Sequence, residues 1–133
     1  MFGDFFSRGG AQGEPSIAWN NLTTADQVEA IKEESRSTPV LIFKHSFSCG
    51  TSAMALDRME RNWIAEEMTD LKPYFLDLLS YRSVSNLVAD TFEVWHQSPQ
   101  VLIIHEGQCI YHSSHLGISY QEVKSVLDEL KTA

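Results

Sequence analysis

The stretch "PVLIFKHSFSCGTSAMALDRM", residues 39–59, joins an apolar run to a helical pattern through a polar turn that contains Cys49. The apolar run is short, continuous and preceded by a proline, which is typical of a central strand buried on both faces. After the turn, "SAMALDRMERNWIAEEM" places Met54, Met59, Trp63 and Met68 among strong helix formers, which predicts an amphipathic helix. Cys49 is therefore expected where a strand passes into a helix.

The rest of the chain repeats this alternation. Helices are expected near residues 25–36 behind Thr24 as N-cap, over "RSVSNLVADTF", and over the C-terminal segment behind Ser119 as N-cap. "KPYFLDLLSY" predicts a strand, and "PQVLIIHEGQCIYHSS" predicts an antiparallel hairpin that turns at Gly107. Alternating strands and helices that close with a hairpin and a helix predict an α/β protein whose central mixed β-sheet is flanked by helices. This is the element order of the thioredoxin-like fold.

Composition limits the class of protein. The 133 residues suit one domain, expected over residues 16–133, behind a flexible N-terminal arm over residues 1–15. The net charge of −8 and the scattered lysines and arginines argue against a nucleic-acid partner, and no apolar run is long enough to span a membrane. The first residues lack the pattern of a secretory signal, and two cysteines without paired spacing fit a reducing compartment. A cytoplasmic protein is expected.

The position of Cys49 predicts thiol chemistry. Unpaired N–H groups and the positive end of the macrodipole at a helix N-terminus favour the thiolate, which is the nucleophilic form of cysteine. Lys44 and His45, just upstream, are expected to add positive charge, and Ser52, one helical turn away, to donate a hydrogen bond to the sulfur. A serine cannot attack a disulfide, so the chemistry is expected to be monothiol. The alternative is a buried, inert cysteine.

Pro99, in "HQSPQVLII", comes just before the first strand of the hairpin. The residue opposite the active cysteine of a thioredoxin fold is a cis-proline, so Pro99 is expected to be cis. The backbone of Ser98 is then expected to pair with a bound thiol compound or an extended peptide. The alternative is a trans-proline that opens an edge strand.

Four segments together resemble the monothiol bacilliredoxin family, the thiol-exchange proteins of the bacillithiol system. They are "FKHSFSCGTSAMA", "RSVSN", "VWHQSPQVLI" and "HSSHLGIS", in this order, and the resemblance runs from about Trp19 to the C-terminus. It implies a thioredoxin-like fold and the removal of bacillithiol from mixed disulfides through Cys49. Bacillithiol, a cysteine joined to glucosamine and malate, is the implied co-substrate, S-thiolated proteins are the implied partners, and no tightly bound cofactor is implied.

The resemblance also indicates site residues. Cys49 and Ser52 match the reactive C-x-x-S motif, and thiol or substrate binding is expected of Lys44, His45, Gly50, Thr51, His96, Ser98, Pro99 and His115. The two malate carboxylates need local positive charge on an acidic protein, for which Arg82 is a further candidate. Each of these cations has a structural alternative as a solvated or hydrogen-bonded residue.

Other interpretations remain open from the sequence. "CGTS" is also similar to the "CGFS" of monothiol glutaredoxins, so a [2Fe–2S] binding module is one alternative, and a redox-inert thioredoxin-fold adaptor is another. Cys109 is expected to be a small apolar residue of the sheet, with a resolving role as the alternative. The spacing of "HSSH" resembles a metal motif, but it lacks an obvious third ligand, and no metal is expected.

Overall fold

The computed structural model describes residues 16–132, so the expected arm lies outside the described residues. The strands of this part are β1 (Asn20–Asn21), β2 (Val40–His45), β3 (Lys72–Asp77), β4 (Gln100–His105) and β5 (Gln108–Ser114). Its helices are α2 (Ala25–Glu34), α3 (Gly50–Asn62), α4 (Arg82–Phe92) and α5 (Tyr120–Thr132), with short 3-10 turns η1 (Ala65–Glu67) and η2 (His115–Gly117). No helix among residues 16–132 is long and apolar enough to cross a membrane.

The strands form one mixed sheet in the order β1-β3-β2-β4-β5. β2 is parallel to β3 and antiparallel to β4, and all its residues are buried, which confirms the predicted central position. Since β5 is antiparallel to β4, the C-terminal ends of β2, β3 and β5 share one edge of the sheet with the start of β4. The polar turn that leads to Cys49 leaves the sheet at this edge.

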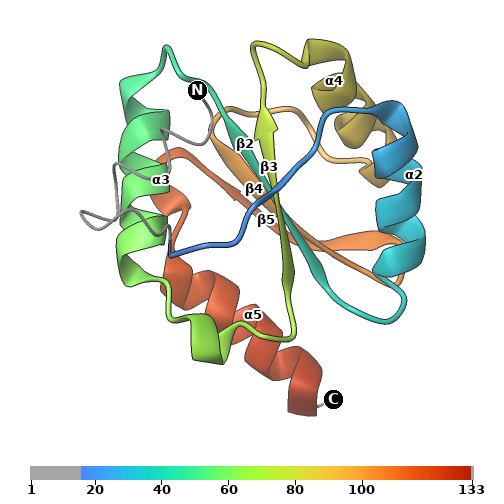
Figure 1. Cartoon of the computed structure of the whole chain (residues 1–133), viewed down its shortest axis with the longest axis vertical. Coiled ribbons are helices and arrows are strands. Elements are labelled where there is room, and N and C mark those ends of the chain that lie inside the picture. The colour runs from blue at the N-terminus through green and yellow to red at the C-terminus, as the bar shows by residue number, and fades with distance from the viewer. Residues whose placement is uncertain (1–15, 133) are drawn as a thin grey trace.

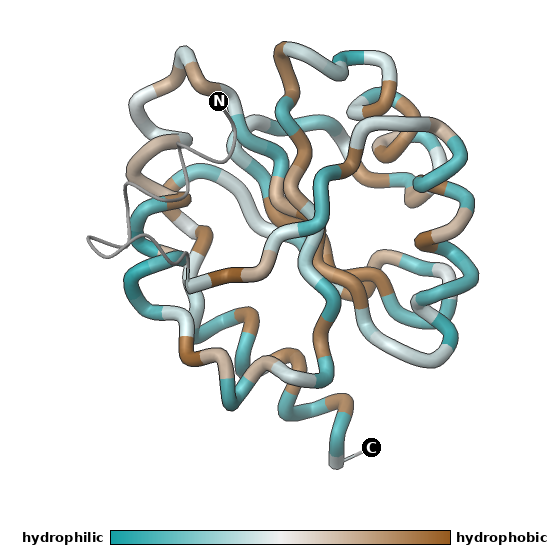
Figure 2. Tube along the Cα trace, in the orientation of Figure 1, coloured by the Kyte–Doolittle hydropathy of each residue, from teal (hydrophilic) through white to brown (hydrophobic). Residues whose placement is uncertain are grey.

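Helices cover both faces of the sheet. Figure 1 shows α3 and α5 on one face and α2 and α4 on the other. Successive residues of β2 alternate between the two cores, with Leu41 and Phe43 beneath α3 and α5 and Val40 and Ile42 beneath α2 and α4. Figure 2 shows the hydrophobic residues gathered along the central strands. Burial on both faces explains why the first four residues of β2, Val40 to Phe43, are all apolar and do not alternate with polar residues.

Local signals in the sequence are confirmed at several boundaries. Thr24 caps α2 in a reciprocal capping box with Gln27, and Ser119 Oγ accepts a hydrogen bond from the backbone N–H of Glu122 at 3.2 Å. The hairpin turns through Glu106 and Gly107, which have φ values of +52° and +79°. Gly107 adopts this left-handed conformation without the clash that a Cβ atom would introduce.

The helix that follows Cys49 is shorter than the sequence predicts. It ends at Asn62 because Trp63 adopts an extended conformation, and its ring packs against Tyr120 of α5 at 5.7 Å between centroids. The turn η1 then brings Met68 into the same core. Met54, expected on the apolar face of this helix, is instead 59% exposed, so that expectation was wrong.

Candidate active site

Cys49 is the N-cap residue of α3, at the edge where β2 ends. Its backbone is extended, with φ −114° and ψ 120°, and its carbonyl accepts the first helical hydrogen bond from Ala53 N–H at 3.1 Å. The thiol is half-buried, and no residue of the described chain hydrogen-bonds to its sulfur. The first turn of α3 contains no acidic side chain, and a Cβ built on Gly50 meets nothing within 4 Å. Cys49 therefore lies beside an open, electropositive helix terminus.

Ser52 lies beneath this turn and is fully buried. Its hydroxyl accepts a hydrogen bond from the backbone N–H of Ser46 at 3.0 Å and lies 2.7 Å from Nδ1 of His45. The expected hydrogen bond from Ser52 to the sulfur of Cys49 is not present in residues 16–132. The serine binds the end of β2 instead, because its position in the first turn of α3 faces the sheet.

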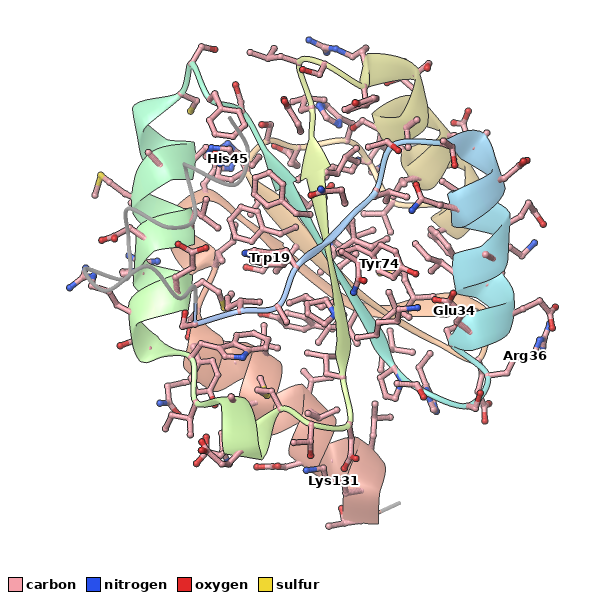
Figure 3. All side chains as sticks on the ribbon, viewed as in Figure 1. Trp19, Glu34, Arg36, His45, Tyr74 and Lys131 are labelled. Carbon is pink, nitrogen blue, oxygen red and sulfur yellow. The ribbon has the colours of Figure 1, made fainter. Side chains whose placement is uncertain are left out.

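His45 is buried on the same face of the sheet as α3. The imidazole lies between the rings of Phe47 and Phe75, with centroid distances of 4.4 and 5.4 Å, and Figure 3 shows it between α3 and the sheet. Burial lowers its pKa to about 4, although the charge of Asp77, the neighbouring position on β3, opposes the shift. His45 is therefore neutral at pH 7, and it supplies no positive charge to Cys49.

Lys44 points to the opposite face of the sheet, because successive strand residues alternate. Its ammonium group is buried, donates a hydrogen bond to the Ser85 carbonyl at 3.3 Å and lies 3.3 Å from Nδ1 of His96. Burial lowers the pKa of Lys44 to about 8, and burial together with the charges of Lys44 and Arg82 lowers the pKa of His96. Lys44 was expected to add positive charge to the Cys49 site, but its ammonium group is buried against Ser85 of α4. On the face of the sheet opposite α3, Lys44 thus contacts His96, which belongs to the segment before Pro99.

The Ser98–Pro99 peptide bond is cis, as predicted. The next residue, Gln100, pairs with Lys44, so Pro99 lies beside the end of β2 from which the chain continues to Cys49. The carbonyl of Pro99 accepts a hydrogen bond from His115 N–H at 3.1 Å, and η2, which begins at His115, contacts α3. Three segments that are distant in sequence thus meet around the thiol.

Exposed apolar side chains lie at the same edge of the sheet. Phe47, in the turn before Cys49, is 45% exposed, Leu116 of η2 is 72% exposed, and Trp95, before the cis-proline, is 90% exposed. These side chains were not predicted as site residues. Single exposed apolar residues are common, but three in the loops of one edge suit a surface that receives another molecule.

Comparison with known proteins identifies the family of this chain. The family model described as monothiol bacilliredoxin BrxC matches residues 20–123. The chain belongs to the monothiol bacilliredoxin family. Membership of this family supports a thiol–disulfide redox function and confirms the resemblance found in the sequence.

Solved structures confirm the thioredoxin-like fold of this bacilliredoxin-family chain. A putative oxidoreductase with a thioredoxin fold is 28% identical, with a TM-score of 0.68, and the match covers 80% of this chain and 91% of that chain. Thioredoxin from Malassezia sympodialis is 14% identical (TM-score 0.67, covering 86% and 92%). Thioredoxin from Trypanosoma brucei brucei is 16% identical (TM-score 0.67, covering 89% and 95%). The two thioredoxins show the fold alone.

The second cysteine of this family member lies far from the first. Cys109 pairs with Ile104, which pairs with Val40 at the opposite end of β2 from the Cys49 turn. The strand from Val40 to His45 alone spans roughly 17 Å, whereas a disulfide needs Cα atoms within about 7 Å. Cys109 therefore cannot resolve a disulfide on Cys49 within this chain. It is half-buried, and burial raises the pKa of its thiol.

The described residues contain no group of three His, Cys, Asp or Glu side chains that could hold a metal ion. Of the predicted cations, Arg82 and His115 are exposed, His96 is half-buried, and Lys44 and His45 are buried. Sequence reasoning did not identify Ser85, although it belongs to the quoted segment "RSVSN". Its carbonyl is the partner of Lys44, and its Oγ lies 3.4 Å from Nδ1 of His96.

Proposed function

We propose that this protein is a monothiol thiol–disulfide oxidoreductase that removes bacillithiol from mixed disulfides through Cys49. The observation that carries the proposal is a half-buried thiol at the N-cap of α3, beside a cis-proline, with a buried serine where a resolving thiol would stand. The N–H groups at the start of α3 stabilise negative charge on the sulfur. Since Cys109 is out of reach, the second thiol must come from another molecule.

The reaction has two exchange steps. The Cys49 thiolate attacks the bacillithiol sulfur of a mixed disulfide, the sulfur–sulfur bond breaks, and the protein sulfur leaves as a thiolate that takes a proton from solvent. Bacillithiol remains on Cys49 as a mixed disulfide. The thiolate of a second bacillithiol then attacks this bacillithiol sulfur, which restores the Cys49 thiolate and forms bacillithiol disulfide. No electrons are needed beyond those of the second thiol.

Residues around the thiol suit a ligand with two carboxylates. Gly50 and Thr51 supply backbone N–H groups at the start of α3, and Ser98 supplies backbone next to the cis-proline. Arg82 and His115 are exposed basic side chains at this edge, so we assign the malate carboxylates to them. Lys44 and His45 are buried, so they act from beneath the site and do not touch the ligand.

Intact mass spectrometry tests the proposal. Reduced protein is exposed briefly to bacillithiol disulfide, with glutathione disulfide in parallel, and C49A is compared with the matched variant C109A. We expect one bacillithiol adduct on the wild type and on C109A, none on C49A, and slower formation of the glutathione adduct. If neither disulfide forms an adduct, the proposal is wrong. A brown protein with visible absorption after anaerobic expression would favour the [2Fe–2S] alternative.

A further inference from the structure

A chain of hydrogen bonds lies beneath the Cys49 turn. It runs from the backbone N–H of Ser46 to Oγ of Ser52 at 3.0 Å, and from that oxygen to Nδ1 of His45 at 2.7 Å. All three residues are buried. These bonds join the last residue of β2, the start of the turn and the first turn of α3. They therefore connect the two ends of the turn that contains Cys49.

The direction of the second bond depends on which ring nitrogen of His45 carries the proton. Backbone N–H is always a donor, so the Ser52 oxygen accepts from Ser46 and keeps one proton of its own to donate. The distance of 2.7 Å to Nδ1 is typical of an O–H donor, whereas N–H donors usually lie at about 2.9–3.0 Å. A neutral imidazole has one nitrogen that accepts. This short distance favours the arrangement in which Ser52 donates its hydroxyl proton to Nδ1 of His45 and the ring proton lies on Nε2.

We propose that His45 is a positioning residue for Cys49 that acts through Ser52 by accepting the only proton of the serine hydroxyl. This inference deepens the exchange function proposed above and rests on it for its role in turnover. It reverses the role that a C-x-x-S motif suggests, because Ser52 has no remaining proton to donate to the thiolate. The Cys49 sulfur is then stabilised by the backbone N–H groups at the start of α3. The hydrogen bond between His45 and Ser52 fixes the position of these N–H groups relative to the sulfur.

The surroundings of His45 suit an acceptor that stays neutral. Phe47 of the turn and Phe75 of β3 pack against the imidazole, and Ser52 approaches from α3. The charge of Asp77 on β3 acts on the imidazole electrostatically. An apolar side chain at position 45 would leave a buried hydroxyl without its acceptor, and a buried polar group without a partner destabilises the structure around it.

Two substitutions at position 45 distinguish the acceptor role of His45 from a role in packing alone. In H45N the side-chain oxygen occupies nearly the position of Nδ1 and can accept the Ser52 proton, whereas in H45Q the polar group extends toward the position of Nε2. The readout is the rate of Cys49 alkylation by iodoacetamide, which does not depend on bacillithiol. We expect H45N to stay within about twofold of wild type, and H45Q and S52A to be slower by about tenfold, the size expected for one lost hydrogen bond. The double variant H45Q/S52A should be no slower than either single variant.

A spectrum of the wild-type protein tests the proton position without any substitution. Long-range ¹H–¹⁵N correlation spectra at pH 7 should show the tautomer of His45 that is protonated at Nε2. A proton on Nδ1 would overturn the proposal, as would an alkylation rate in S52A equal to wild type. Because neither measurement uses bacillithiol, a failure here is distinguishable from the absence of a bacillithiol adduct.

Discussion

Replacing Lys44 by methionine tests how much the buried ammonium group lowers the free energy of unfolding. The Lys44 ammonium is fully buried, and its hydrogen-bonding neighbours are the carbonyl of Ser85 and Nδ1 of His96. None of the ion pairs formed within residues 16–132 includes Lys44. A buried cation without a carboxylate destabilises the folded state, and methionine has a similar length without the charge.

The magnitude follows from the pKa of Lys44, which burial lowers from 10.5 to about 8. This difference corresponds to about 3 kcal/mol. The unfolded chain holds the proton more tightly, so between pH 8 and 10.5 it binds more protons than the folded chain, and the free energy of unfolding rises with pH. Below pH 8 the whole penalty is present. The lost bonds to Ser85 and His96 offset about 1–3 kcal/mol of the gain in K44M.

Urea unfolding at pH 7, 8, 9 and 10, followed by circular dichroism, measures the effect. We expect K44M to be as stable as wild type or up to about 2 kcal/mol more stable at pH 7. Between pH 7 and 10 the wild type should gain about 2–3 kcal/mol relative to K44M. K131M, which removes an exposed lysine of α5, should show no such change. If the difference between wild type and K44M is constant with pH, the reasoning is refuted.

Further predictions concern both cysteines, the core and acid stability. S52C should form an internal disulfide with Cys49, detected as loss of two free thiols after mild oxidation, and should release a bacillithiol adduct without a second thiol. C109S should keep the wild-type exchange rate within about twofold, since Cys109 lies at the other end of the sheet; a large loss of activity would contradict the topology. L102A should lower the free energy of unfolding by about 2–5 kcal/mol in urea titrations, because Leu102 is fully buried in the core beneath α2 and α4. Burial lowers the pKa of His45 from 6.5 to about 4, so the unfolded chain binds the extra proton as the pH falls from 6.5 to 4, and stability should drop by up to about 3 kcal/mol. The corresponding drop should be smaller in H45N, and equal drops would show that His45 titrates normally.

Much of the site was predictable because its signals are local. A proline, an apolar run and a polar turn before a helical pattern placed Cys49 at a helix N-terminus, and the structure has it there. The cis state of Pro99 was expected from its position before the hairpin, and the turn at Gly107 from its glycine. The positions of Cys49 and Gly107 depend on backbone preferences within a few residues, whereas the cis state of Pro99 was expected from the thioredoxin-like fold.

The partners of the polar side chains were not predictable in this way. Lys44 and His45 are adjacent in sequence and were expected to act together, but strand alternation places them on opposite faces of the sheet. Ser52 was expected to donate a hydrogen bond to the sulfur of Cys49. Its hydroxyl instead contacts Nδ1 of His45, because the first turn of α3 packs against β2 through the side that contains Ser52.

The sequence by itself determined the fold, the family and the position of Cys49 at a helix N-terminus, since these follow from periodicity and from short segments in a set order. Only the tertiary structure decided which polar groups are buried and which surround the thiol. The reason is physical: burial of Lys44, His45 and Ser52 depends on helices and strands that lie far away in the chain. Their protonation and hydrogen bonds depend on that burial.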